Sequence, residues 1–234
     1  MTIFSLATKI FFREFRSGQL LLMFLSLSLA VGIVASITFF TDRLDGSLMM
    51  ESKQFLGGDL KYESDTPLDE SSFPIGDYSY ASIYEFGSVL GSSKKFQLAS
   101  VKSVSQPYPL IGEFEILKKY DERVLETNPP KSGKVWLDTR LANLLEVTID
   151  DTINIGEKDF SISGIILAES DRGAGSFAFA PKVIMNSSDL EEANVIQPGS
   201  RVRFSYIFVG SEEAIELLEN FFQSEKNIFD LPSS

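Results

Sequence analysis

The stretch LLLMFLSLSLAVGIVASITFFT, residues Leu20–Thr41, decides how this 234-residue chain is organised. It contains no charged side chain, and as a helix rising about 1.5 Å per residue it would reach roughly 33 Å, which matches a hydrocarbon layer of about 30 Å. A buried helix of a globular protein is rarely apolar on every face over such a length, and the apolar part of a cleaved signal peptide is shorter, about 7–15 residues. The sequence therefore predicts a retained transmembrane helix over residues 20–41.

Residues 1–19 precede this helix and mix apolar side chains with Lys9, Arg13 and Arg16. On a helical wheel the cations gather on one side and the phenylalanine and isoleucine side chains spread over the other. That pattern is typical of a helix lying in the lipid headgroup layer, with its basic residues against anionic lipid. A charged flank with no helix of its own is the alternative. We assign residues 1–19 to a cytoplasmic or interfacial amphipathic segment, with these three basic residues at the membrane interface.

Charge is distributed unevenly along the chain, which carries 21 basic and 33 acidic residues and a formal net charge of -12. Before Asp42 the ionisable residues are Lys9, Arg13 and Arg16 against Glu14, a net charge of +2. Subtracting three from 21 and one from 33 leaves 18 basic and 32 acidic residues from Asp42 onward, a net charge of -14. The positive-inside rule places the N-terminus in the cytoplasm and the acidic body outside. Such a body also argues against binding nucleic acid, whose phosphates attract cations.

Several classes of enzyme are excluded by composition, because the chain has no histidine and no cysteine. Imidazole bases, thiol nucleophiles and sites held by histidine or cysteine are absent. Gly133-Lys134 is followed by Val135 and lacks the leading glycine of a phosphate-binding loop. Neighbouring carboxylates diverge on strands and helices and make no paired acid–base site. Ser92-x-x-Lys95 leaves an anchored hydrolase as an alternative. We otherwise expect no enzyme activity, no cofactor and no metal.

A helical pattern continues beyond the apolar stretch, over residues 42–58. Apolar side chains recur at spacings of four and seven, between charged residues, and two adjacent glycines then provide the backbone freedom that suits a helix stop. We expect this segment to be a stalk that carries the membrane helix into water. The residues that define the stalk are Leu44, Leu48, Phe55, Gly57 and Gly58.

Residues 59–234 alternate short strands with short helices and predict a mixed α+β extracytoplasmic domain. The expected strands are 59–64, 79–90, 95–104, 114–117, 134–137, 147–155, 159–167, 182–185 and 201–209. Short helices are expected after Pro67, after Asp138 and near residues 187–192, and residues 118–134 are expected to form a surface excursion. A last amphipathic helix, 211–223, should turn inward Ala214, Ile215, Leu217, Leu218, Phe221 and Phe222.

A glycine-rich loop, DRGAGSFAF, covers residues 171–179. It lacks the spacing of a dinucleotide-binding turn, so a cofactor cradle is not expected there. Phe177 and Phe179 beside Gly173 and Gly175 are candidates for an apolar surface that meets a lipid-like ligand or a partner.

Four phrases carry a family resemblance. They are RLDGSLMMESKQFLGGDL (Arg43–Leu60), FQLASVKSVSQPYPLIGEF (Phe96–Phe114), GKVWLDTRLANLLEVTIDDTINIG (Gly133–Gly156) and FAPKVIMNSSDLEEANVIQPGSRVRF (Phe179–Phe204). With the basic segment, the span and the stalk, they resemble the N-terminal part of FtsX/MacB-type ABC transporter permeases, and most of all the YbbP-like branch, which is linked with lipid-related export. The resemblance implies a MacB-like core domain on the outer side of the bacterial inner membrane.

The resemblance also implies a non-catalytic permease subunit with several partners. A separate ATPase subunit would bind ATP, and further permease segments or a second permease, membrane lipid and a periplasmic partner would complete the system. Motion would pass through the stalk to the external domain, which handles lipids, lipoproteins or other amphiphiles. A single-span anchored binding or scaffold domain is the alternative.

This sequence departs from the family pattern at two points. Asp150-Asp151 stands at a turn that is commonly Gly-Asp, and the chain stops at Ser234 after one span. We therefore expect a truncated product or a fragment of a longer permease.

Overall fold

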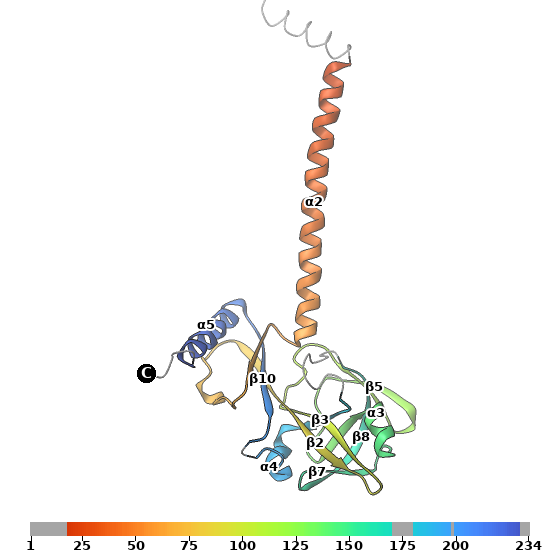
Figure 1. Cartoon of the computed structure of the whole chain (residues 1–234). Coiled ribbons are helices and arrows are strands. Elements are labelled where there is room, and N and C mark those ends of the chain that lie inside the picture. Colours follow the sequence, from red (N-terminus) through yellow and green to blue (C-terminus); the bar gives the residue numbers. More distant parts are fainter. Residues whose placement is uncertain (1–17, 170–179, 198, 230–234) are drawn as a thin grey trace, which may run out of the picture. The chain divides into compact units, whose positions relative to one another are not determined.

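The computed structural model describes residues 18–169, 180–197 and 199–229, and for residues 19–20, 45–56 and 225–229 it describes the backbone (Figure 1). The chain divides into two units, Met1–Glu51 and Ser52–Ser234, and each is described by itself.

A single long helix, α2 (Gln19–Leu56), dominates the first unit and extends into the second. Its 38 residues would span roughly 57 Å at about 1.5 Å each, well beyond a hydrocarbon layer of about 30 Å. Within it, Leu21–Leu44 has a mean hydropathy of 2.3, and none of it is buried inside the protein. The Ser26 hydroxyl donates to the Met23 carbonyl oxygen at 2.9 Å, which satisfies a polar group within the apolar stretch. By length and composition this segment can cross a membrane.

The second unit is built on a ten-stranded mixed sheet, so the expected α+β class is confirmed. Along the sheet the strands run in the order β1-β10-β2-β3-β9-β6-β8-β4-β5, with β7 pairing β2 and β8. The strands are β1 (Leu60–Ser64), β2 (Tyr78–Gly91), β3 (Phe96–Val104), β4 (Phe114–Lys118), β5 (Glu122–Glu126), β6 (Lys134–Asp138), β7 (Thr152–Ile155), β8 (Lys158–Glu169), β9 (Lys182–Asn186) and β10 (Val202–Gly210).

Strand pairing closes into a ring. From β2 it runs through β3, β9, β6, β8 and β7 and back to β2, with β3/β9 and β6/β8 parallel and the other pairs antiparallel. The main core cluster takes a fully buried side chain from each of these six strands, so the ring encloses an apolar interior. These side chains are Leu90, Val101, Val183, Leu137, Ile162 and Ile155. Two arms, β10–β1 and β4–β5, extend the sheet from β2 and β8.

Short helices cover parts of this sheet. They are η1 (Glu70–Ser72), η2 (Lys119–Asp121), α3 (Thr139–Leu145), η3 (Ser187–Asp189) and α4 (Leu190–Ala193). The Asp138 carboxylate caps α3 by accepting from the Leu141 N–H at 2.5 Å, as the sequence predicts.

The C-terminal helix α5 (Glu212–Phe229) packs against β10 and β1. Phe222 stacks on Tyr62 with ring centroids 4.1 Å apart, and it belongs with Phe73 to an aromatic group over the β10 arm. The prediction that Leu217 points inward is wrong, since this residue is 45% exposed. The helix meets the sheet along a narrower stripe centred on Leu218 and Phe222.

Two other expectations are also wrong. The surface excursion over 118–134 contains strand β5, which pairs with β4, and its charged residues suit an edge strand and conceal its alternation in the sequence. The strand expected over 147–155 begins only at Thr152. Asp151 accepts from the Thr148 N–H at 2.7 Å, and Asp150 has φ +74°, so the first half of that segment is a turn.

Two glycines in left-handed conformation provide a matched stability test. Gly156 (φ +62°) lies so close to α4 that an added Cβ would be 2.0 Å from the Ala193 carbonyl oxygen, whereas Gly133 (φ +75°) has nothing within 4 Å. Gly133→Ala should lower the free energy of unfolding by about 1 kcal/mol through backbone strain alone. Gly156→Ala should lower it by about 3 kcal/mol or more, because the carbonyl must also move. Urea unfolding of the full chain in detergent measures both, and equal losses would contradict this steric account.

Candidate functional site

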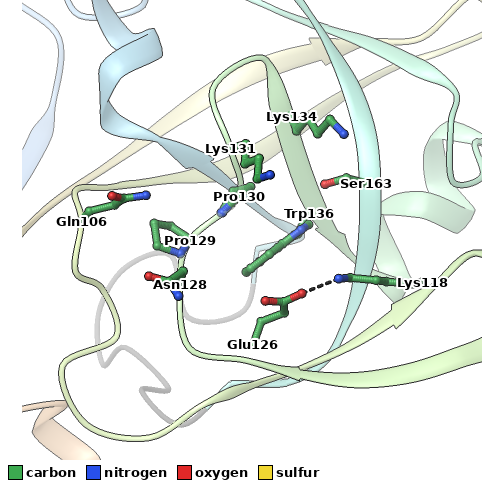
Figure 2. A pocket seen from close by; sticks show the side chains of 10 residues that line it. All are labelled: Gln106, Lys118, Glu126, Asn128, Pro129, Pro130, Lys131, Lys134, Trp136 and Ser163. Atoms are coloured by element: carbon green, nitrogen blue, oxygen red, sulfur yellow. Dashed lines mark hydrogen bonds and ion pairs between the residues drawn. The ribbon is translucent and has the colours of Figure 1, made fainter.

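A pocket of about 520 Å³ lies on the outside of the ring, beside β6 (Figure 2). Segments far apart in the sequence contribute to it: the loop after β3, both strands of the β4–β5 arm, the β5–β6 connection, β6 itself and β8. Its lining residues are Gln106, Lys118, Glu126, Asn128, Pro129, Pro130, Lys131, Lys134, Trp136 and Ser163.

Trp136 lies at the centre of the labelled side chains in Figure 2. Its neighbours on β6, Val135 and Leu137, belong to the main core cluster, whereas Trp136 belongs to a second cluster. That separation follows from the two-residue period of a strand. The indole is 4% exposed and meets the Phe114 ring edge to face at 5.4 Å. On β8, Gly164 allows close packing here, since a Cβ there would lie 2.4 Å from Ile116 Cγ2 and 3.2 Å from Trp136 Cδ1.

The pocket wall formed by the β5–β6 connection is held from behind. Asn186 donates to the Pro130 carbonyl oxygen at 3.0 Å. The Ser132 hydroxyl and the Gly133 N–H donate to the Asp189 carboxylate at 2.6 and 3.0 Å. These bonds fix the connection against η3, so the pocket is a formed feature of the domain.

Asp189 is the centre of this support and is fully buried. Burial alone would raise the pKa of its carboxyl group. The hydrogen bonds from Lys158 Nζ (2.7 Å), Ser132 and Gly133 outweigh that effect and hold the pKa below its usual value. Lys158 also pairs with the exposed carboxylate of Glu192 at 2.6 Å, which keeps the ammonium group in position.

The electrostatic character of the pocket is positive. Lys118 pairs with Glu126 inside it. Lys131 and Lys134 are exposed, and within the described residues their side chains make no ion pair or hydrogen bond. Three ammonium groups and one carboxylate therefore line a pocket in a domain that is strongly acidic overall.

A second charged cluster lies between β3, β8 and β9. The Glu169 carboxylate is paired with Lys102 and, at 2.8 Å, with Lys182, and Lys102 Nζ donates to the Tyr108 hydroxyl at 2.6 Å. The Lys102 and Glu169 side chains are 1% and 8% exposed. Burial would raise the pKa of Glu169, but the two ammonium groups outweigh it and lower that pKa. The cluster ties together the two strands that flank residues 170–179.

Most of the site residues proposed from sequence cannot be placed against this geometry. Lys9, Arg13 and Arg16 lie outside the described residues, and so do Gly173, Gly175, Phe177 and Phe179. Leu44 is 45% exposed on α2, and the backbone of Leu48 and Phe55 is helical.

The two stalk glycines differ in what the structure requires of them. The helix ends at Leu56, where the sequence predicts, and Gly57 follows with φ +74°. Gly58 is needed for close approach instead, since a Cβ there would lie 2.8 Å from the Phe208 carbonyl oxygen.

The Ser92–Lys95 pattern does not form a nucleophile pair. The Ser92 hydroxyl bonds to the Leu145 carbonyl oxygen at 3.0 Å, and Lys95 Nζ pairs with Glu146 at 2.7 Å. These contacts hold the β2–β3 turn against the end of α3. Among the described residues no group of three or more carboxylates could hold a metal ion.

The pocket itself is absent from the sequence-based expectations. Its lining comes from segments that only the ring and the β4–β5 arm bring together. One signal was available: Trp136 is the single tryptophan of the chain and lies between two aliphatic residues of a strand.

Asp189→Asn should lower the free energy of unfolding at pH 7 by about 3 kcal/mol, because Lys158 loses its buried partner. Glu192→Gln, which removes the exposed partner of the same lysine, should change it little. The folded-state pKa of Asp189 is depressed, so its contribution is complete above the unfolded-state value of about 3.9 and is lost as the pH falls through the folded-state value.

The difference between wild type and Asp189→Asn should therefore shrink as the pH falls below about 4. Urea unfolding of the full chain in detergent, followed through Trp136 fluorescence, measures it. A difference that stays constant down to pH of about 2 would contradict the assignment of this carboxylate as charged.

One curated protein is similar to the chain in sequence: the "Uncharacterized ABC transporter permease YbbP" of Escherichia coli K12, 32% identical over 218 residues. The match covers 90% of this chain and 26% of that protein, so the chain spans about a quarter of the length of this relative. Comparison with models of protein families finds no match.

Solved structures with a similar arrangement include the periplasmic region of MacB from Actinobacillus actinomycetemcomitans, at 13% identity and a TM-score of 0.41, covering 67% of this chain and 77% of that one. The extracellular domain of the noncanonic ABC-type transporter YknZ from Gram-positive bacteria gives 7% identity and a TM-score of 0.39, covering 62% and 75%.

Proposed function

Because the chain belongs to the family of ABC transporter permeases that includes YbbP, we propose that it forms the membrane anchor and the extracytoplasmic domain of a permease subunit. One observation carries the proposal: 32% identity over 90% of the chain. An alignment of that length includes the domain and at least part of the apolar helix. The alternative of an anchored scaffold domain unrelated to transport explains the anchor but not this identity.

The stalk provides a route by which motion could reach the domain. Helix α2 is continuous from the apolar segment to Leu56, and a helix transmits displacement along its axis because each turn is hydrogen-bonded to the next. Just beyond it, the Asp59 N–H donates to the Phe208 carbonyl oxygen at 2.8 Å, and the Asp59 carboxylate accepts from the Gly210 N–H at 3.2 Å. In this proposal, movement at residues 57–59 reaches β10 and through it the ring.

The chemistry that drives transport would come from other subunits. ABC transporter permeases are transport components rather than catalysts, and the family implies an ATPase partner. We propose that ATP is bound by that separate subunit, and that further permease segments or a second permease complete the membrane pathway. As cargo we propose lipids, lipoproteins or other amphiphiles, handled on the outer side of the bacterial inner membrane.

The orientation can be tested with single cysteines, because the native chain has none and gives no background. In intact spheroplasts, Lys94→Cys, at the exposed turn between β2 and β3, should react with a membrane-impermeant maleimide. Thr2→Cys should react only after the membrane is permeabilised. The reverse pattern would show that the acidic body faces the cytoplasm and would contradict the proposed topology.

Association with an ATPase tests the transport role directly. When the product of the complete gene is tagged and purified from membranes in mild detergent, an ABC ATPase subunit should co-purify in a fixed ratio, as quantified by mass spectrometry. The matched control is the same purification from cells in which the gene carries no tag. A stable complex of the complete product without any ATPase would instead support the anchored scaffold.

A further inference from the structure

The indole N–H of Trp136 has an unusual position. Trp136 is 4% exposed and lines the pocket. Its N–H donates to no acceptor in the described part of the chain. Among the described residues the fully buried side-chain polar atoms that lack a partner are the hydroxyls of Ser100 and Ser103. The indole nitrogen is not among them, so it keeps contact with the open space of the pocket. An N–H that the protein leaves unpaired but accessible can donate to a ligand or to water in the pocket.

The charges around this donor favour an anionic acceptor. Lys118 is neutralised by Glu126, whereas Lys131 and Lys134 have no carboxylate partner among the described residues. Several other lysines of the domain are paired, such as Lys95 with Glu146 and Lys158 with Asp189 and Glu192. Lys94, at the exposed turn between β2 and β3, has no carboxylate partner among the described residues, but it stands alone outside the pocket. Two unpaired lysines at the rim of one pocket, in a chain with a net charge of -12, form a local reversal of sign.

We propose that this pocket is a binding site for a phosphate group, held by the ammonium groups of Lys131 and Lys134 and by the indole N–H of Trp136. Lysine acts as a point charge that suits phosphate, and no arginine, whose planar fork matches a carboxylate, lines the pocket. The amides of Gln106 and Asn128 and the hydroxyl of Ser163 supply further polar groups (Figure 2). At about 520 Å³ the pocket also has room for a small group attached to the phosphate.

Phosphate could reach the pocket as a lipid headgroup or as a free phosphate ester, and the two share this chemistry. The site goes beyond the transport proposal and does not depend on it, because binding is a property of this chain alone. A result without binding would leave the ATPase test untouched, and a complex without ATPase would leave the pocket untouched.

Trp136 reports on its own site, since it is the single tryptophan of the chain. The full chain in phosphatidylcholine nanodiscs is titrated with inorganic phosphate, glycerol 3-phosphate and dihexanoylphosphatidic acid, against sodium chloride at matched ionic strength. Two signals are followed: the fluorescence of Trp136 and the indole N–H cross-peak of the chain labelled with 15N-tryptophan. We expect a saturable change in both signals with at least one of the phosphate probes and none with chloride.

The variant Lys131→Gln/Lys134→Gln should raise the dissociation constant at least tenfold. Lys94→Gln, which removes one exposed lysine outside the pocket, should leave it within twofold. Both lysines of the double variant are exposed, so its fold should survive, and an unchanged thermal midpoint verifies this. Tenfold tighter binding of dihexanoylphosphatidic acid than of glycerol 3-phosphate assigns a lipid headgroup, and equal binding assigns a free phosphate ester. No saturable response to any probe, or a response that the double variant retains in full, overturns the proposal.

Discussion

The four-residue strand β7 is the constraint on which the architecture of the domain depends, because it hydrogen-bonds to β2 on one side and to β8 on the other. Without it the sheet would be an open path from β1 to β5, with its interior face exposed. With it, six strands close around one apolar cluster, and all further strands become arms on the outside. The second cluster, which includes Trp136, packs on the other side of these strands and takes buried side chains from β2, β3, β4, β6, β8, β9 and β10. The pocket lies outside this ring, where the β4–β5 arm, the β5–β6 connection, β6 and β8 meet.

Local elements could be predicted from the sequence, and their assembly could not. Strands β2 and β3 follow from the apolar runs expected over 79–90 and 95–104, and α3 follows Asp138, whose carboxylate caps it. Strand β5 was not predicted because it is an edge strand rich in charged residues, and such a composition resembles that of a loop. The closure of the ring could not be predicted from the sequence because β7 pairs with β2 through only two residue pairs, Leu90↔Ile155 and Gly91↔Asn154. The periodicity of apolar residues indicates whether a segment forms a helix or a strand, but it does not indicate which distant segment pairs with that strand.

The ion pairs of the domain show that part of its acidic charge is buried and neutralised. Asp189 and Glu169 are buried carboxylates, and each is matched by lysine side chains that the sequence places far away. The net charge of -14 from Asp42 onward says nothing about such pairs, because it sums solvated and buried groups alike. The same sum conceals a positive pocket. The placement of charge in this domain therefore cannot be read from its composition.

The exposed apolar surface of α2 limits how force could act on the domain. Leu22, Phe39 and Phe40, for example, are 69%, 74% and 68% exposed. The transfer of each such side chain from water to lipid is favourable by roughly 1.5–3 kcal/mol. Over the whole span that amounts to tens of kcal/mol, whereas a domain is stable by about 5–15 kcal/mol. Extracting such a helix from a membrane would therefore cost more free energy than unfolding the domain. The proposed transmission through the stalk would then use small displacements at residues 57–59, where two backbone hydrogen-bonding groups of β10 hold the chain.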